Sequence, residues 1–179
     1  MKTFIFRISV IILALSLQTV FSAELDHETT QKIKDRMQVF IPMTGQWEGS
    51  GWIRIDGNKE EFTQTEDVKF ILDDTLLIVK GLGLDMTEDK NIIHEAYATL
   101  SYDFINDRYR MENYLSDGTY NNANMLFHGN GKFEWSFEVP EGIIVFIIEI
   151  ADGQWNEKGY FRRFEGLEYH FFEMNLQRI

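Results

Sequence analysis

The chain contains no cysteine among its 179 residues. Disulfide bonds, thiolate nucleophiles, cysteine-ligated zinc and iron–sulfur clusters are therefore all excluded. Several common enzyme motifs are also missing, because we find no Gly-x-Ser-x-Gly, no phosphate-binding loop and no dinucleotide-binding fingerprint. Nothing in the chain points to a nucleophilic or nucleotide-dependent enzyme, and we name no catalytic residue.

Proline and positive charge are scarce as well. The chain has two prolines, and its 17 Lys and Arg are outnumbered by 29 Asp and Glu, which leaves a formal net charge of −12 at pH 7. An acidic chain of this kind repels phosphate backbones and anionic lipid surfaces. Nucleic acid is therefore not an expected partner.

Residues 1–22 have the layout of a secretory signal peptide. Lys2 and Arg7 supply positive charge, residues 8–20 are almost continuously apolar, and residues 20–22 offer a cleavage site. The segment is too short for a stable membrane span, although an uncleaved anchor is the alternative. We expect its removal, which takes away two positive charges and changes the formal charge from −12 to −14. The protein is then exported, to the periplasm or outside the cell, with no remaining membrane span.

Residues 23–42 predict one N-terminal helix. Asp26 can cap its start, Ile33, Met37 and Phe40 recur at helical spacing, and Pro42 is expected to stop it. We expect this helix to close one mouth of a barrel; a partner-binding helix is the alternative.

Residues 43–179 form a single domain in which the hydrophobic period changes from 3.6 to 2. Short turn sequences rich in Asp-Gly and Asn-Gly separate the apolar stretches, which is typical of hairpins. The pattern predicts an all-β fold, a single antiparallel meander β-barrel. About ten strands are expected, over residues 46–55, 61–72, 76–82, 92–104, 108–115, 121–128, 132–139, 143–150, 155–164 and 168–178.

The first predicted strand places Trp47, Gly49 and Gly51 on one face. Glycines inside a strand usually mark sharp coiling or the close approach of another backbone. Gly81-Leu82-Gly83, by contrast, is expected in a hairpin or rim loop. Residues 143–148 are apolar on both faces, and we expect the helix to cover the outer one; an exposed interaction patch or an aggregation-prone strand is the alternative.

The opening Gly45-x-Trp47-x-Gly49-x-Gly51 resembles the calycin superfamily, which includes lipocalins, fatty-acid-binding proteins and nitrobindin-like haem barrels. Together with the leader and the late aromatic strands, it is most similar to a family of exported bacterial calycin-like barrels. The resemblance implies that Gly45, Trp47 and Gly49 belong to the barrel closure, with Arg178 packed over the Trp47 ring; Arg162 or Arg163 is the alternative. It also makes His170 a candidate haem ligand, since nitrobindin-like barrels use a histidine of the last strands.

Candidate ligand-binding residues lie on four of the predicted strands. His94 shares a face with Ala96, Ala98 and Tyr102, where small residues either clear a cavity or make room for large neighbours such as Trp135. On the last strand, His170 and Met174 are expected to share the inward face. His94 and His170 lack a third ligand at a suitable spacing, so no metal site is expected.

Arg110, Glu112 and Tyr114 alternate along one strand. If they face inward they can hold a ligand's head group, as an inward Arg or Tyr does in fatty-acid-binding proteins; an ordinary solvated outer face is the favoured alternative. Glu112 and Glu134 are also a candidate carboxylate pair for acid–base work.

The sequence thus predicts a barrel that binds a small apolar or amphipathic molecule. A haem-binding barrel or an enzyme with interior His and Glu is one alternative. A packed barrel that works through its surface, with no interior cavity, is another.

Overall fold

The computed structural model describes residues 27–179. An α-helix covers residues 27–37 and continues as the 3-10 helix η1 (Gln38–Met43). The predicted signal peptide and the Asp26 cap lie outside the described residues. Within the described part of the chain, no helix is both long and apolar enough to cross a membrane.

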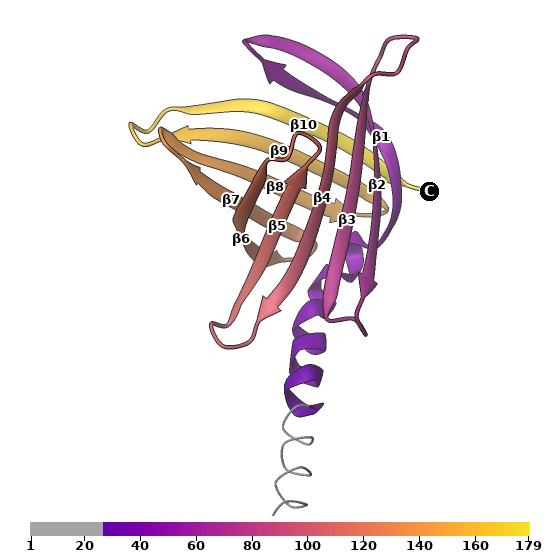
Figure 1. Ribbon diagram of the computed structural model, residues 1–179, viewed down its shortest axis with the longest axis vertical. Coiled ribbons are helices and arrows are strands. Elements are labelled where there is room, and N and C mark those ends of the chain that lie inside the picture. Colours follow the sequence, from indigo (N-terminus) through magenta and orange to yellow (C-terminus); the bar gives the residue numbers. More distant parts are fainter. Residues whose placement is uncertain (1–26) are drawn as a thin grey trace, which may run out of the picture.

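Ten antiparallel strands follow the helix and form a closed barrel (Figure 1). Each strand pairs with the next along the chain, and β10 returns to pair with β1, so that no edge strand is left open. The predicted all-β meander is confirmed. The strands are β1 (Gly45–Ile55), β2 (Asn58–Ile71), β3 (Leu76–Asp85), β4 (Ile92–Asp103), β5 (Arg108–Leu115), β6 (Tyr120–Gly129), β7 (Lys132–Val139), β8 (Gly142–Ala151), β9 (Gln154–Arg163) and β10 (Glu168–Arg178).

Tight turns account for the short connections. Between β6 and β7, Asn130 and Gly131 have φ angles of 52° and 71°. Between β8 and β9, Asp152 and Gly153 have φ angles of 51° and 73°. Two consecutive positive φ angles match the right-handed twist of the flanking strands, which is why Asn-Gly and Asp-Gly favour such hairpins. These dipeptides are therefore sound sequence signals for the strand boundaries.

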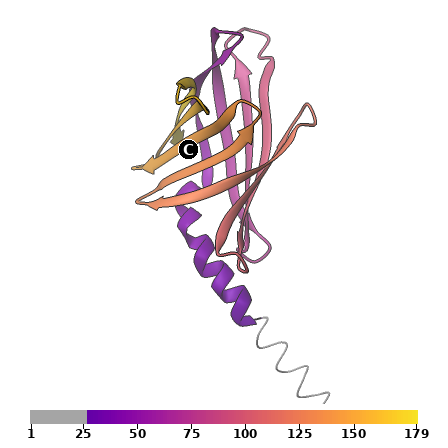
Figure 2. The same ribbon diagram turned by 90° about the vertical axis from the view of Figure 1, so that its left-hand side faces the viewer.

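The C-terminal part of the N-terminal helix lies in one mouth of the barrel, and its first turns project beyond the ends of the strands (Figures 1 and 2). Phe40 is fully buried, with its ring 5.4 Å from that of Phe133 and 5.1 Å from that of Tyr109. Ion pairs join Lys34 to Asp73 and Arg36 to Asp107, in the β2–β3 and β4–β5 turns. The position at a barrel mouth agrees with the expected lid.

Two expectations about this region were wrong. Pro42 does not stop the helix but lies inside η1, where its fixed φ is compatible with 3-10 geometry. The helix also does not cover the outer face of β8, because Phe40 packs on inward-facing rings. Val145, on the outer face of β8, is nevertheless only 2% exposed. It pairs in register with Ser136 of β7 and with Tyr160 of β9.

Candidate ligand-binding site

The barrel interior holds a cavity of about 370 Å³. Ligand sites in proteins typically begin near this size and are mostly apolar. The cavity extends from Met43 and Trp155, at the helix end, to Ile93 and Phe137 near the opposite mouth. Its other apolar walls come from Ile53, Phe62, Val79, Ala96, Ala98, Leu100, Met111, Leu115, Met125, Trp135, Ile144, Phe146, Ile148, Phe171, Phe172 and Met174.

Small residues on two adjacent strands create part of this space. Gly81 of β3 pairs with Ala96 of β4, and both line the cavity together with Ala98. The expectation of a hairpin or rim loop at residues 81–83 was wrong, since they lie within β3. A Cβ at Gly81 would lie 2.7 Å from Glu66 Oε1, so the glycine leaves room for a large side chain on the neighbouring strand.

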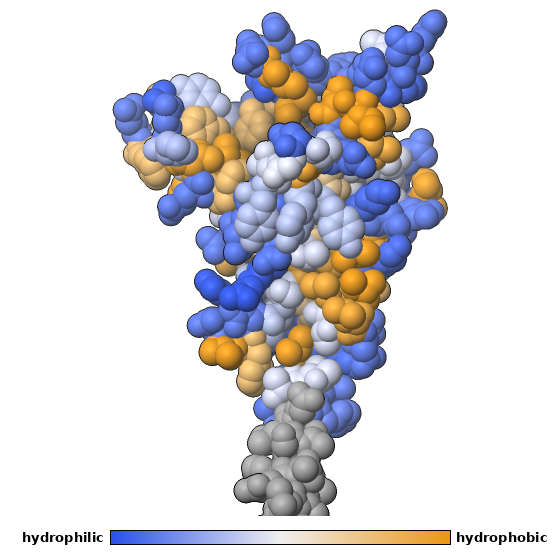
Figure 3. Space-filling model, in the orientation of Figure 1, coloured by the Kyte–Doolittle hydropathy of each residue, from blue (hydrophilic) through white to orange (hydrophobic). Residues whose placement is uncertain are grey.

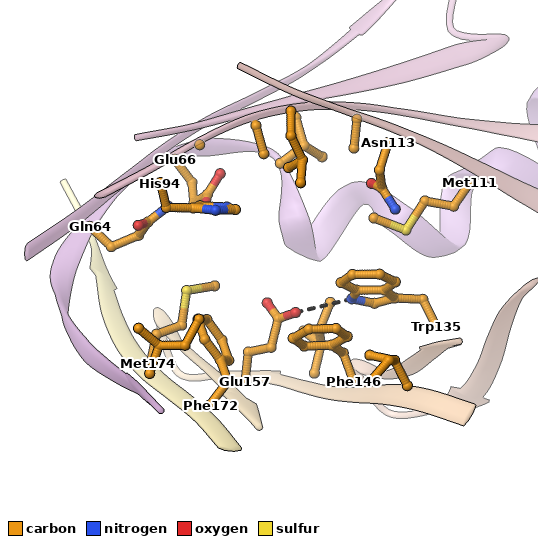
Figure 4. Close-up of a pocket in the computed structure, with 18 of the residues that line it drawn as sticks. Gln64, Glu66, His94, Met111, Asn113, Trp135, Phe146, Glu157, Phe172 and Met174 are labelled. Atoms are coloured by element: carbon orange, nitrogen blue, oxygen red, sulfur yellow. Dashed lines mark hydrogen bonds between the residues drawn. The ribbon is translucent and has the colours of Figure 1, made fainter. Parts of the chain in front are cut away.

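That side chain, Glu66 of β2, is the first of two buried carboxyls in the cavity (Figure 4). Gln64 Nε2 donates to Glu66 Oε1 at 2.7 Å. The remaining oxygens of the pair, Gln64 Oε1 and Glu66 Oε2, are buried without a hydrogen-bond partner. Burial raises the pKa of Glu66 to about 8, against the hydrogen bond from Gln64, while the charge of Glu157 raises it further.

Glu157 of β9 is the second buried carboxyl, on the opposite wall (Figure 4). Its Oε1 accepts from Trp135 Nε1 at 3.0 Å, and its Oε2 accepts from Trp155 Nε1 at 3.2 Å. Burial raises its pKa to about 7, although the two indole hydrogen bonds favour the charged form. Both oxygens of Glu157 therefore accept a hydrogen bond, whereas only one oxygen of Glu66 does.

His94 of β4 adds a third titratable group to the wall. It pairs in register with Gly83, and a Cβ at Gly83 would lie 2.8 Å from Gln64 Oε1 and 3.2 Å from His94 Cβ. Gln64 and His94 therefore flank the gap left by this glycine. His94 lines the cavity, and its partial burial lowers its pKa, which favours the neutral imidazole.

The polar part of the cavity has one sign of charge. Its residues are Gln64, Glu66, His94, Asn113, Asn121 and Glu157, and no Lys or Arg belongs to the lining that the described residues form. In residues 27–179, no three His, Asp or Glu side chains gather closely enough to hold a metal ion.

Three of the predicted ligand-binding residues line this cavity: His94, Trp135 and Met174. Their contact with a ligand stays a prediction. Tyr102 lies at the closed mouth instead, where its hydroxyl hydrogen-bonds to Asp107 and Arg36 lies 5.5 Å from its ring.

Arg110, Glu112 and Tyr114 lie on the outer face of β5, because Met111 and Asn113 are the residues that line the cavity. Arg110 pairs with Asp103 at 3.0 Å, and the Tyr114 hydroxyl lies 3.4 Å from Glu112 Oε2. This geometry fits the interpretation that the three residues belong to a solvated outer face of the barrel. The molecular face in Figure 3 carries mainly hydrophilic side chains with separate hydrophobic groups between them. Glu112 and Glu134 do not form an interior pair.

His170 is separated from the cavity by a β-bulge. The register of β10 against β9 shifts between His170 and Phe172, so the two residues no longer share a face. The His170 ring instead lies between outer side chains, 4.8 Å from Trp52 and 5.0 Å from Tyr160. It therefore does not fit the role of an axial ligand for a haem inside the barrel.

The β1–β10 seam has the geometry that the calycin resemblance implies. Trp47 is fully buried and donates to Met43 O at 2.8 Å, and the Arg178 guanidinium lies 4.4 Å from its ring centroid. Arg178 also donates to Pro42 O at 2.7 Å, which ties the last strand to η1. A Cβ at Gly49 would lie 2.1 Å from Asn175 O, and Gly45 adopts φ of +121°. The glycines thus permit close approach of β10.

Sequence reasoning missed Gln64, Glu66, Asn113 and Glu157. One signal was present in β2. Phe62, Gln64, Glu66 and Val68 occupy every second position, so the two polar residues share the buried face with the two apolar ones. The paired glycines of β3, which match Gln64 and Glu66 in register, were the second signal.

No protein-family model matches the chain, and no curated protein matches it either. Among solved structures, it is similar to Rv2717c from M. tuberculosis, with a TM-score of 0.62 and 12% identity over 80% of this chain and 96% of that one. It is also similar to the S-type phycobiliprotein lyase CPES from Guillardia theta, with a TM-score of 0.54 and 11% identity over 79% and 91% of the two chains. These likenesses, with the closed ten-strand barrel, identify a calycin-like fold.

Proposed function

We propose that this protein is an exported calycin-like barrel that binds a small, mainly apolar molecule in its interior. The observation that carries the proposal is the cavity of about 370 Å³, lined almost entirely by apolar and aromatic side chains. A purely structural barrel requires no such cavity. The likeness to a phycobiliprotein lyase supports the proposal at the level of fold.

Uptake of a hydrophobic fluorescent probe, titrated into the folded protein, tests this proposal. We expect saturable binding that Ala98→Leu weakens by about tenfold or more, because the added side chain occupies the cavity. Ala151→Leu, at the exposed end of β8, is the matched control and should bind as the original protein does. Absence of saturable uptake, or equal binding by both variants, would overturn the proposal.

A proton-transfer enzyme is the second candidate, favoured by two buried carboxyls of raised pKa in one cavity. Such groups exchange protons near neutral pH. Enolisable cyclic ketones incubated with the protein in deuterated buffer should then acquire deuterium, and Glu66→Gln or Glu157→Gln should remove that activity. Incorporation at the rate of protein-free buffer would count against catalysis on this substrate class.

Export rests on residues 1–22 of the sequence, with their positive start and apolar run. We expect the protein, expressed in a bacterium, to appear in the periplasm or medium at a mass lacking this segment. Retention in the cytoplasm at full mass would contradict it. Membership of the family of exported bacterial calycin-like barrels is proposed on the same grounds and on the Gly45-x-Trp47-x-Gly49-x-Gly51 opening.

A further inference from the structure

We propose that the cavity selects molecules that carry a protonated amine, or a comparable nitrogen group rich in N–H donors, on an apolar body, with the nitrogen held by Glu66 and Gln64. This inference rests on the proposed binding function and names the chemistry of its ligand.

The first argument is an excess of acceptors at the Glu66 site. Gln64 and Glu66 are 2% and 8% exposed, and each has one side-chain oxygen that is buried without a donor. The indole N–H groups of Trp135 and Trp155 are already directed to Glu157, so they do not serve this site. Gln64 Oε1 is a buried acceptor without a partner, and so is Glu66 Oε2 in the carboxylate form. Such an acceptor costs free energy, which a ligand that brings donors recovers.

The second argument is charge. The cavity holds two carboxyl side chains and no Lys or Arg in the lining formed by residues 27–179. The whole chain is acidic as well, with a formal net charge of −12, and such a field attracts cations. A carboxylate head group, which fatty-acid binders hold with inward Arg or Tyr, finds no such partner because Arg110 and Tyr114 of β5 face outward. The interior is thus complementary to a positive head group.

The third argument is orientation. Glu66 pairs in register with Trp47 and therefore lies toward the end of the barrel that the helix closes. The residues toward the opposite mouth are mostly apolar, namely Ile53, Ile93, Leu115, Phe137 and Ile144; the polar ones there, His94 and Asn121, carry no acidic group. An amphipathic ligand consequently fits with its polar nitrogen deep in the barrel and its apolar part toward the mouth, where that part stays out of water.

Binding of a cation also changes the protonation of the site. The groups that share the cavity with Glu66 are Gln64 on its own strand, His94 of β4 and Glu157 of β9. Since burial raises the pKa of Glu66 to about 8, the free protein holds this carboxyl largely protonated at pH 7. An ammonium group favours the carboxylate, so its binding must release a proton.

The test compares dodecylamine, dodecanol and dodecanoate, which share a chain and differ in the head group. Each is titrated into the full folded protein at pH 7 while the fluorescence of the cavity tryptophans is recorded. We expect dodecylamine to bind about tenfold or more tightly than dodecanol, as charge-assisted hydrogen bonds require, and dodecanoate to bind most weakly. Calorimetry in two buffers of different ionisation enthalpy should detect proton release with dodecylamine alone.

Glu66→Gln should bring the dodecylamine-to-dodecanol preference close to about one, because the amide carries no charge to favour the ammonium group. Asp67→Asn is the matched control, because it removes the next carboxylate along β2, which faces outward and pairs with Lys69. It should keep the preference for the amine. Equal binding of the three molecules, or a preference for dodecanoate, overturns this inference but leaves the binding function standing. Failure of all three to bind overturns both.

Discussion

At the scale of single residues, the unusual feature is a pair of carboxyls inside an otherwise apolar barrel. Glu66 and Glu157 are 8% and 6% exposed, and burial raises the pKa of both. Such groups cost stability when they ionise without full compensation. Glu157 is compensated by two indole donors, whereas Glu66 has only the amide of Gln64. Glu66 is therefore the residue from which the largest pH effect is expected.

The free energy of unfolding should fall as pH rises from about 4.5 to about 8. In this window folded Glu66, with its pKa of about 8, keeps a proton that the unfolded chain, with the ordinary value of 4.5, has released. The folded state then binds more protons, so stability decreases by up to about 1.4 kcal/mol per pH unit for this group. Urea denaturation across this range measures the slope.

Glu66→Gln should reduce that slope, because the amide has nearly the same shape and does not titrate, while Glu157, with its pKa of about 7, keeps its own share of the slope. At pH 8 we expect the variant to be more stable than the original protein by about 1–3 kcal/mol, with a difference near zero at pH 4.5. Asp67→Asn on the outer face should leave the slope unchanged. A variant that is less stable at pH 8 would show that ionised Glu66 is compensated in the fold.

The sequence predicted the residues of the strands far better than the direction of their side chains. Period-2 patterns and Asp-Gly or Asn-Gly turns located all ten strands, because these signals are local. The face that turns inward depends on the whole barrel. Arg110 and His170 were both candidates for the interior. In β5 the odd-numbered residues Met111 and Asn113 face inward, so Arg110 faces outward. In β10 the bulge between His170 and Phe172 turns His170 outward although Phe172 faces the cavity.

At the scale of elements, the β1–β10 seam and the N-terminal helix are joined into one closure. Arg178 of β10 contacts the Trp47 ring of β1 and the carbonyl of Pro42 in η1, while Trp47 donates to Met43. This end of the barrel therefore depends on strands from both ends of the chain. The seam was expected from the sequence because the Gly45-x-Trp47 opening resembles the calycin pattern, and Arg178 was expected from that resemblance alone, since no local pattern indicates it.

Trp47→Ala should lower the free energy of unfolding by about 3–5 kcal/mol, since it leaves a cavity where a fully buried ring was packed. Trp52→Ala is the control on the same strand. Its ring lies on the outer face near Arg54 and Lys59, and its loss should cost about 1 kcal/mol or less. Chemical denaturation of both variants measures these two losses. A loss below about 1 kcal/mol for Trp47→Ala would show that Trp47 does not hold the barrel end closed.

Phe40→Ala tests whether the helix is an integral part of the barrel. The ring is fully buried against Phe133 and Tyr109, so its removal should cost about 3–5 kcal/mol. The neighbouring Ile41 is 50% exposed, and Ile41→Ala should cost about 1 kcal/mol or less. Equal effects from the two substitutions in thermal unfolding would mean that the helix only rests on the barrel.

At the scale of the whole molecule, the ten strands pair into a closed barrel that encloses a cavity. Ala96 and Ala98 stand where larger side chains would fill the interior, and the surrounding walls are mostly apolar. An unfilled apolar cavity lowers stability because its lining loses dispersion contacts. A chain selected only for stability would gain by filling it, so the cavity fits the proposed binding function.

Stability and binding should consequently change in opposite directions at Ala98. Ala98→Leu adds apolar volume inside the cavity and should raise the free energy of unfolding by about 0.5–2 kcal/mol, as cavity-filling substitutions commonly do. The same variant should take up the hydrophobic probe about tenfold more weakly. Thermal unfolding with and without probe measures both effects, because the ligand stabilises only a protein that binds it. If Ala98→Leu instead lost stability and kept its affinity, the leucine would be strained against the wall and the space beside Ala98 would not be the ligand's.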